Sequence, residues 1–168
     1  MDPQAVIEVF RRNLTEHYFD LTGRVRRQEF WYFILACFVV YIAVAIIDAI
    51  LRTGILLPLV ALALLLPMTG LGARRLQDIG RNGSLVWVWA LVSAVMQLFG
   101  LLAFMTAGPY GAAGSWYVFL TLGWLIGLIN LAMLVVSIVL IYFWVQPGTA
   151  GPNEYGPDPK AGAAPTKV

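Results

Sequence analysis

The chain has little charge, one cysteine and one histidine. Only 12% of its 168 residues are charged, about half of what a soluble domain of this size carries. Cys37 can form no intrachain disulfide, so no disulfide framework organises the fold. His17 lies in a polar N-terminal segment, where we expect it to be solvated. No nucleophile–base pair and no metal-ligand set is visible, so we expect no catalytic residues, cofactor or metal.

Long apolar runs are abundant instead, since 60% of the residues are hydrophobic. A membrane span needs about 20 such residues, because about 30 Å of hydrocarbon is crossed at about 1.5 Å per helical residue. We therefore expect an all-α integral membrane protein, a bundle of four transmembrane helices in one membrane domain at residues 23–145. The four predicted spans are Phe30–Leu51, Gly54–Ala73, Leu85–Ala107 and Trp116–Val145.

The basic residues are distributed unevenly between the two sides that these spans define. If all four segments cross, Arg52 alone lies on one side, and the other ten of the 11 Lys and Arg residues lie on the opposite side. The positive-inside rule then predicts that both termini are cytoplasmic. We expect membrane lipids, including anionic ones, as partners, and no nucleic acid.

Residues 1–22 form a separate amphipathic segment in this interpretation. Within Pro3–Phe19, apolar side chains recur at helical spacing. Such a helix either lies in the headgroup region or packs on the cytoplasmic loops of the protein itself. Its apolar face is formed by Ile7, Phe10, Leu14 and Tyr18.

Few polar residues interrupt the spans. Asp48 and Arg52 are four positions apart near the end of the first span, which predicts a helical ion pair at the outer interface. An acid within a span also suggests a proton relay. Small and polar residues share one helical face on the third and fourth spans, in the order Ser93, Gln97, Gly100 and then Gly123, Gly127, Asn130.

We interpret this stripe as a helix-packing surface, in which Gly123 and Gly127 form a GxxxG element. Gln97 and Asn130 fall at similar depth, so we expect their amides to hydrogen-bond, because an unpaired amide in hydrocarbon is costly. The same stripe would also suit the seam of a homo-oligomer or the lining of a polar pathway.

Three polar motifs punctuate the chain: G-R-V-R-R-Q-E-F-W at 23–31, R-R-L-Q-D-I-G-R-N-G at 74–83, and P-G-T-A-G-P-N-E-Y-G-P-D-P at 147–159. In this order they resemble the YhaH type of small bacterial inner-membrane proteins, a family of unknown function. The resemblance implies the bacterial inner membrane and supplies no activity. Gln77 stands where that family usually has histidine, so no metal or acid–base histidine is expected there.

The arginine motifs allow two interpretations. In the first, Glu29 and Asp78 clamp the start of the first span to the loop after the second. In the second, the arginines in excess of these acids bind a lipid headgroup or another anion, because guanidinium groups bind phosphate and carboxylate through two bonds. The residues concerned are Arg24, Arg26, Arg27, Glu29, Arg74, Arg75, Asp78 and Arg81.

The C-terminal tail, residues 146–168, is rich in glycine and proline and cannot be helical. We expect an extended segment that docks through Tyr155 and is disordered after about residue 160. A turn with positive φ is predicted around Gly80, before the third span.

Three functions fit these features. The first is a non-enzymatic membrane component that binds lipids or partner proteins, with homo-oligomerisation possible. The second is a subunit of an oligomeric transporter or channel, which requires the Ser93–Gln97–Asn130 stripe to line a wet path. The third, for which the residues give least support, is a membrane enzyme acting on a lipid-linked substrate.

Overall fold

Five helices make up the described part of the chain. The computed structural model describes residues 2–107 and 112–161. The helices are α1 (Pro3–Thr15), α2 (Arg27–Leu51), α3 (Leu56–Asp78), α4 (Ser84–Ala107) and α5 (Ala112–Val145). Within α2 to α5 there are four stretches long and apolar enough to cross a membrane. The prediction of an all-helical protein with four helices of membrane-spanning length is therefore confirmed.

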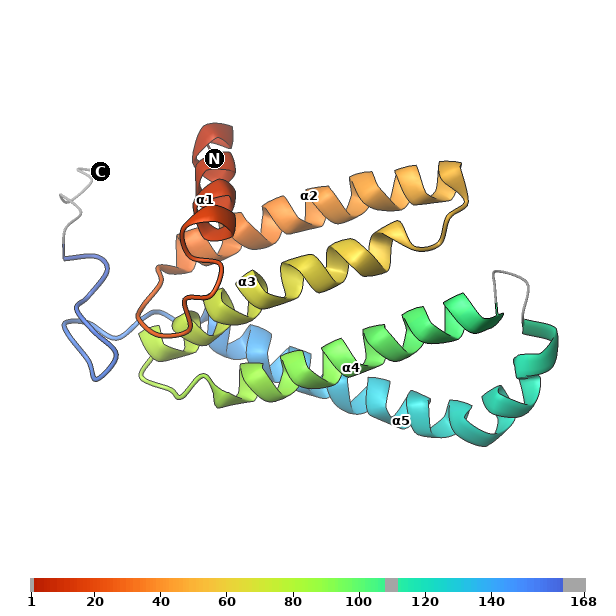
Figure 1. The fold of residues 1–168 in the computed structure, drawn as a ribbon. Coiled ribbons are helices and arrows are strands. Elements are labelled where there is room, and N and C mark those ends of the chain that lie inside the picture. The colour runs from red at the N-terminus through yellow and green to blue at the C-terminus, as the bar shows by residue number, and fades with distance from the viewer. Residues whose placement is uncertain (1, 108–111, 162–168) are drawn as a thin grey trace.

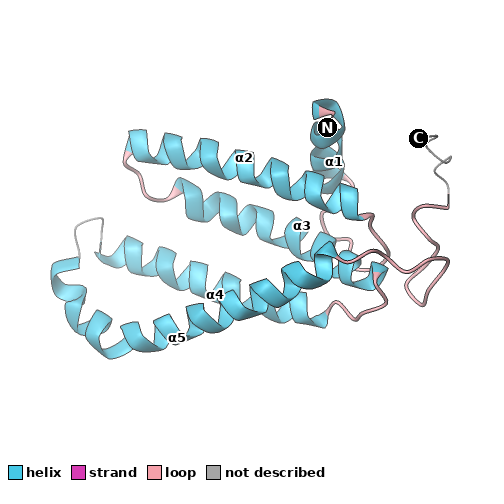
Figure 2. Ribbon diagram, turned by 180° about the vertical axis from the view of Figure 1, so that it is seen from behind, coloured by secondary structure: helices cyan, strands magenta, loops and turns pink. Residues whose placement is uncertain are grey.

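The long helices lie side by side with α3 at the centre (Figure 1). Helix α3 contacts α2 on one side and α4 and α5 on the other, and Figure 2 shows the same order from behind. The most apolar window of α3 is 39% buried, against 6–11% for the other three helices. The outer helices thus present most of their apolar side chains outward, as expected for helices that face lipid.

Helix α1 runs across one end of the bundle at a steep angle to the spans (Figure 1). Its N-terminus is capped by Asp2, whose carboxylate accepts the amide N–H of Gln4 at 2.9 Å. The helix ends at Thr15, short of the predicted Phe19. Val9 and Asn13 are buried against the bundle, whereas Ile7 is 66% exposed. One face of α1 therefore packs on the protein itself, while other apolar groups stay uncovered.

The buried core is concentrated near the end of the bundle where α1 lies. One cluster joins α2 and α3 through Phe30, Phe33 and Leu71. Trp144 of α5 links this cluster to a second one between α3, α4 and α5. The centre of the Trp144 ring lies 4.8 Å from that of the Phe30 ring, and the Trp144 indole N–H donates to the Gly72 carbonyl at 3.1 Å.

Helix α3 continues beyond the predicted end of the second span. The apolar run stops at Ala73, but the helix extends to Asp78, and Arg74 and Arg75 are buried within it. Arginine, leucine and glutamine are good helix formers, so nothing in this motif stops the helix before Gly80. Gly80 has φ of +74°, which confirms the predicted turn.

Candidate functional site

Two buried arginines share one buried carboxylate at the end of the bundle that α1 crosses. Arg24 precedes α2, and its Nε donates to Asp78 Oδ1 at 3.0 Å. Arg75 lies one turn before Asp78 on α3 and donates to the other carboxylate oxygen. All three side chains are at most 3% exposed. We call Arg24, Arg75 and Asp78 the triad. Because it pairs one carboxylate with two guanidinium groups, the triad retains a positive charge.

The remaining guanidinium donors of the triad bind backbone carbonyls. Arg24 donates to the carbonyl oxygens of Thr149 and Gly151, each at 2.6 Å. Arg75 donates to the carbonyls of Trp144, at 3.1 Å, and Gln146. Helix α5 ends at Val145, so Arg75 meets orphan carbonyls at the negative end of the helix dipole. The triad thus fixes the end of α5 and the start of the tail.

Asp78 and Gln77 also hold the tail through their backbone. Thr149 donates its amide N–H and its hydroxyl to the Asp78 carbonyl, at 2.9 and 3.0 Å. Asn153 donates its side-chain amide to the Gln77 carbonyl at 2.9 Å. Gly148 passes so close that an added Cβ would lie 2.8 Å from Asp78 Cγ. The tail docks on the bundle, as expected, and the hydrogen bonds that hold it there come from these residues; the predicted anchor, Tyr155, is half-buried.

The tail also has internal bonds that shape it. The Asp158 carboxylate accepts amide N–H groups from Lys160, at 2.9 Å, and Gly151, at 3.1 Å. These hydrogen bonds lower the pKa of Asp158, with a smaller contribution from the charge of Arg24. A hydrogen bond to Glu154 raises the pKa of the Tyr155 hydroxyl.

A cavity of about 310 Å³ lies between the N-terminus of α2 and the tail. Arg26 donates its Nε to the Pro159 carbonyl at 2.6 Å, and Arg27 donates to the Val145 carbonyl at 3.2 Å. No side chain caps the first turn of α2. Among the described residues, none of the three cationic side chains at this cavity forms a salt bridge. We call this space the basic cavity; it is lined by Arg26, Arg27, Gln28, Asp78, Pro147, Gly148 and Lys160.

The other predicted members of the arginine cluster have separate partners. Of the two expected clamping acids, Asp78 joins the start of α2 to the end of α3, whereas Glu29 pairs with Arg12 of α1 at 3.1 Å. Arg74 donates to the buried Asn13 side chain at 3.0 Å. Arg81 lies over the Phe143 ring at 4.2 Å. Helix α1 is therefore attached to the bundle by Arg12 and Asn13, two residues that the motif analysis did not select.

The predicted ion pair between Asp48 and Arg52 is wrong in this structure. Asp48 instead accepts a hydrogen bond from the Thr53 hydroxyl, and the Leu57 amide lies 3.5 Å from its second oxygen. Arg52 ends α2 in the left-handed conformation, with φ of 53°. The helix geometry that brings residues four apart together does not extend to Arg52, so the pair does not form.

The predicted hydrogen bond between Gln97 and Asn130 is also absent. Asn130 donates to the Ile126 carbonyl of its own helix at 2.8 Å, and Gln97 Oε1 is buried without a partner. Gly100 and Gly127 have no atom within 4 Å of an added Cβ, so none of the described side chains packs closely there. We call the end of the bundle that carries the basic cavity the basic end. Nearer this end, the Trp89 indole N–H of α4 donates to the Ser137 hydroxyl of α5 at 3.0 Å. The polar bond that the structure shows between these two helices is therefore formed by Trp89 and Ser137 and not by the two amides.

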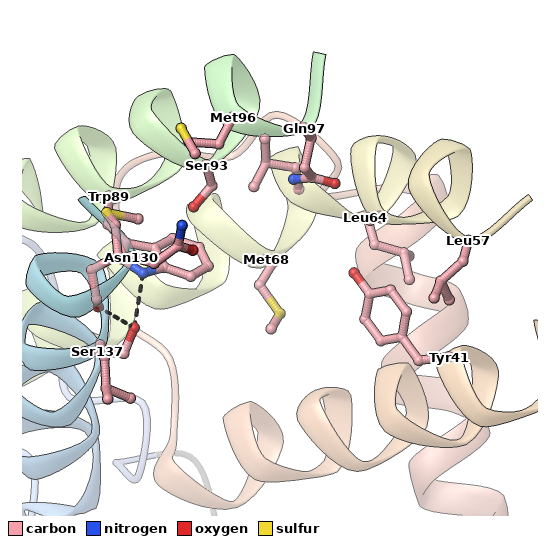
Figure 3. A pocket seen from close by; sticks show the side chains of 14 residues that line it. Tyr41, Leu57, Leu64, Met68, Trp89, Ser93, Met96, Gln97, Asn130 and Ser137 are labelled. Carbon is pink, nitrogen blue, oxygen red and sulfur yellow. Dashed lines mark hydrogen bonds between the residues drawn. The ribbon is translucent and has the colours of Figure 1, made fainter. Parts of the chain in front are cut away.

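Ser93, Gln97 and Asn130 line a second cavity, of about 610 Å³, between the long helices (Figure 3). Gly123, which is half-buried, is not among its lining residues. The polar residues of the stripe thus face a cavity, and its glycines do not line that cavity. We call this space the intramembrane cavity.

The family model described as "Protein of unknown function (DUF805)" matches residues 18–157. The chain belongs to this family. Among curated relatives, it is 32% identical over 155 residues to the inner membrane protein YhaI of Escherichia coli (strain K12), covering 90% of this chain and 95% of YhaI. It is 28% identical over 151 residues to the inner membrane protein YhaH of the same organism, covering 86% of this chain and 91% of YhaH.

No solved structure matches this DUF805 chain significantly. The region matched by the family model contains all three polar motifs except the last two residues of the tail motif, Asp158 and Pro159. Within residues 2–107 and 112–161, no three His, Cys, Asp or Glu side chains are grouped as metal ligands. The described side chains place charged donors at the basic cavity and neutral polar groups at the intramembrane cavity.

Proposed function

We propose that this chain is a non-enzymatic component of the bacterial inner membrane that binds an anionic lipid headgroup at the basic cavity. The observation that carries the proposal is the convergence of Arg26, Arg27 and Lys160 on one cavity without salt-bridge partners in the described residues. The inner-membrane location is supported by the printed names of the E. coli relatives.

The charge of the cavity favours an anion. Asp78 is the one acid that lines it, and Asp78 is already bound by Arg24 and Arg75. The first-turn N–H groups of α2, a helix of 25 residues, lie at the same place and add the positive end of a helix dipole. Charge-assisted bonds from guanidinium groups to phosphate oxygens are strong and directional.

The position of the cavity favours a lipid over a soluble anion. The apolar run of α2 begins at Phe30, about one helical turn after Arg26. If α2 crosses the membrane, Arg26 and Arg27 therefore lie near the level of the lipid phosphates. In this proposal the basic end faces the cytoplasm, in accord with the positive-inside rule.

The test is titration of delipidated, detergent-purified protein with dioleoylphosphatidylglycerol, followed by native mass spectrometry. Each cation near an anionic surface contributes about 1 kcal/mol, or roughly a fivefold change in affinity. Lys160→Gln is therefore expected to weaken binding about fivefold, and Arg27→Gln/Lys160→Gln about 25-fold. Dioleoylphosphatidylcholine should bind weakly to all variants, and inorganic phosphate in competition shows whether the headgroup alone suffices.

The matched control is Arg11→Gln, which removes an exposed arginine of α1 whose side chain has no partner in the described residues. This variant should bind phosphatidylglycerol within twofold of wild type. Equal losses in Arg11→Gln and Lys160→Gln would show nonspecific attraction to the whole basic surface and would refute a headgroup site.

A second candidate function, a subunit of an oligomeric transporter or channel, is favoured by one observation: the Ser93–Gln97–Asn130 stripe lines the intramembrane cavity. No charged side chain is among the described lining residues, whereas ion pathways usually carry charged groups. Cysteines placed at Ser93 and Asn130 in a Cys37→Ala background distinguish the two functions. Rapid labelling of both by a membrane-impermeant thiol reagent would support transport, and protection of both would reject it.

A further inference from the structure

The intramembrane cavity combines an apolar wall with polar side chains that have no partner across it. Tyr41 of α2, Ser93 and Gln97 of α4 and Asn130 of α5 project into the same space (Figure 3). Gln97 Oε1 is enclosed and accepts no hydrogen bond, and the Asn130 amide donates within its own helix. The Tyr41 and Ser93 hydroxyls form no hydrogen bond with any of the described residues.

Such groups are expensive inside hydrocarbon unless something satisfies them. An unpaired amide or hydroxyl in an apolar medium loses several kcal/mol relative to water in transfer measurements. The unpaired groups of Tyr41, Ser93 and Gln97 face one space, together with the acceptor oxygen of Asn130, and therefore point to an occupant that can hydrogen-bond. The leucine and methionine side chains on the remaining wall point to an occupant that is mainly hydrocarbon.

The volume and the charge of the cavity narrow the class of occupant. About 610 Å³ is within the usual range of small-molecule sites, about 300–1,000 Å³. Water alone is a poor filling, because each buried water needs two to four polar partners and most of this wall is apolar. Because the described lining residues include no charged side chain, an ionised ligand would have no counter-charge there.

We infer that the intramembrane cavity binds one molecule of an uncharged lipid, whose hydroxyl or carbonyl head is held by Gln97, Asn130, Ser93 and Tyr41. Part of its hydrocarbon lies along the wall formed by residues such as Met68 and Met133, and the rest extends through the open side of the cavity into the membrane. This site is separate from the basic cavity: the two share no lining residue, and one is charged whereas the other is neutral.

The test uses the delipidated full chain in detergent and 1,2-dioleoylglycerol as the probe, with bound molecules counted by native mass spectrometry. Wild type is expected to bind one molecule per chain. Ser93→Phe fills the cavity and should weaken binding at least tenfold. Gln97→Leu keeps the side-chain size but removes the amide, and should weaken binding about threefold to tenfold.

The matched control is Leu91→Phe, which places the same ring on α4 at a side chain that is 66% exposed and outside the cavity. It should bind like wild type. Thermal unfolding in detergent checks that Ser93→Phe is folded, and Gln97→Leu provides a second test if it is not. Lys160→Gln should leave dioleoylglycerol binding unchanged, so failure of this site and failure of the headgroup site are distinguishable.

Three results would overturn the inference. The first is equal dioleoylglycerol binding by Ser93→Phe and Leu91→Phe. The second is binding of phosphatidylglycerol that Ser93→Phe abolishes, because the cavity would then accept a charged head. The third is labelling of Ser93→Cys, in the Cys37→Ala background, by an impermeant thiol reagent as fast as an exposed cysteine, because the cavity would then be filled with water.

Discussion

The basic end and the middle of the bundle are built in opposite ways. At the basic end, Arg24, Arg75 and Asp78 are buried and joined to one another and to tail carbonyls. In the middle, Gln97 and Asn130 face a cavity without meeting, and an added Cβ at Gly127 would meet none of the described atoms within 4 Å. Polar bonds therefore define the structure at the end of the bundle that α1 crosses, whereas the helices leave a cavity between them in the middle.

The largest expected effect comes from removing the shared carboxylate. Asp78→Ala leaves two buried guanidinium groups without a counter-charge, so we expect a loss of about 3–5 kcal/mol in unfolding free energy. Glu29→Ala removes a pair whose side chains are 31% and 38% exposed, and should cost about 0–1 kcal/mol. Chemical unfolding in detergent measures both. Similar losses in the two variants would contradict the contrast between the buried triad and the outer pair.

A smaller effect on the unfolding free energy is expected from adding one methyl group at the basic end or in the middle of the bundle. Gly148→Ala places a Cβ against the Asp78 carboxylate, and such overpacking costs about 1–3 kcal/mol. Gly100→Ala meets none of the described atoms outside its own helix backbone and should be neutral or stabilising by about 0.5–1 kcal/mol. The unfolding midpoint should fall in Gly148→Ala and stay unchanged or rise in Gly100→Ala. A destabilised Gly100→Ala would indicate a close helix contact in the middle of the bundle after all.

The smallest expected effect is a change of tail docking with pH. The native pKa of Asp158 is lowered from its ordinary value of 3.8, so its contribution to docking is present above that value. As the pH falls below 3.8 and then passes through the lowered pKa of native Asp158, this contribution is lost. A spin label at Glu154→Cys, in the Cys37→Ala background, should therefore gain mobility in acid. In Asp158→Asn the label should already be more mobile at neutral pH; unchanged mobility there would rule out this role for Asp158.

The helical spans were predictable because hydrocarbon imposes a length and a composition that sequence shows directly. The turn at Gly80 was predictable from its motif, and the cluster of arginines at one end followed from the distribution of charge. Neither of these two predictions requires knowledge of which side chains meet in space.

The contacts of the site were less predictable. The tail is held mainly through backbone carbonyls of residues such as Thr149 and Gly151, and every residue type has such a carbonyl. Hydrophobicity ends at Ala73 and therefore predicts the end of the span there, whereas the helix itself continues to Asp78, because the residues that follow are good helix formers. The predicted Gln97–Asn130 bond does not form, because similar depth in the membrane does not fix which way two side chains point, and the Asn130 amide bonds within its own helix.

The most direct test of the docked basic end is hydrogen exchange of the amides in residues 147–158, in wild type and in Asp78→Ala. The Thr149 amide donates to the Asp78 carbonyl, and the Asn153 and Gly156 amides donate to each other's carbonyls. This segment should therefore exchange slowly in wild type and near the rate of an unstructured peptide in Asp78→Ala. Fast exchange in wild type, or equal protection in both proteins, would contradict the role of the arginine–aspartate triad in holding the tail.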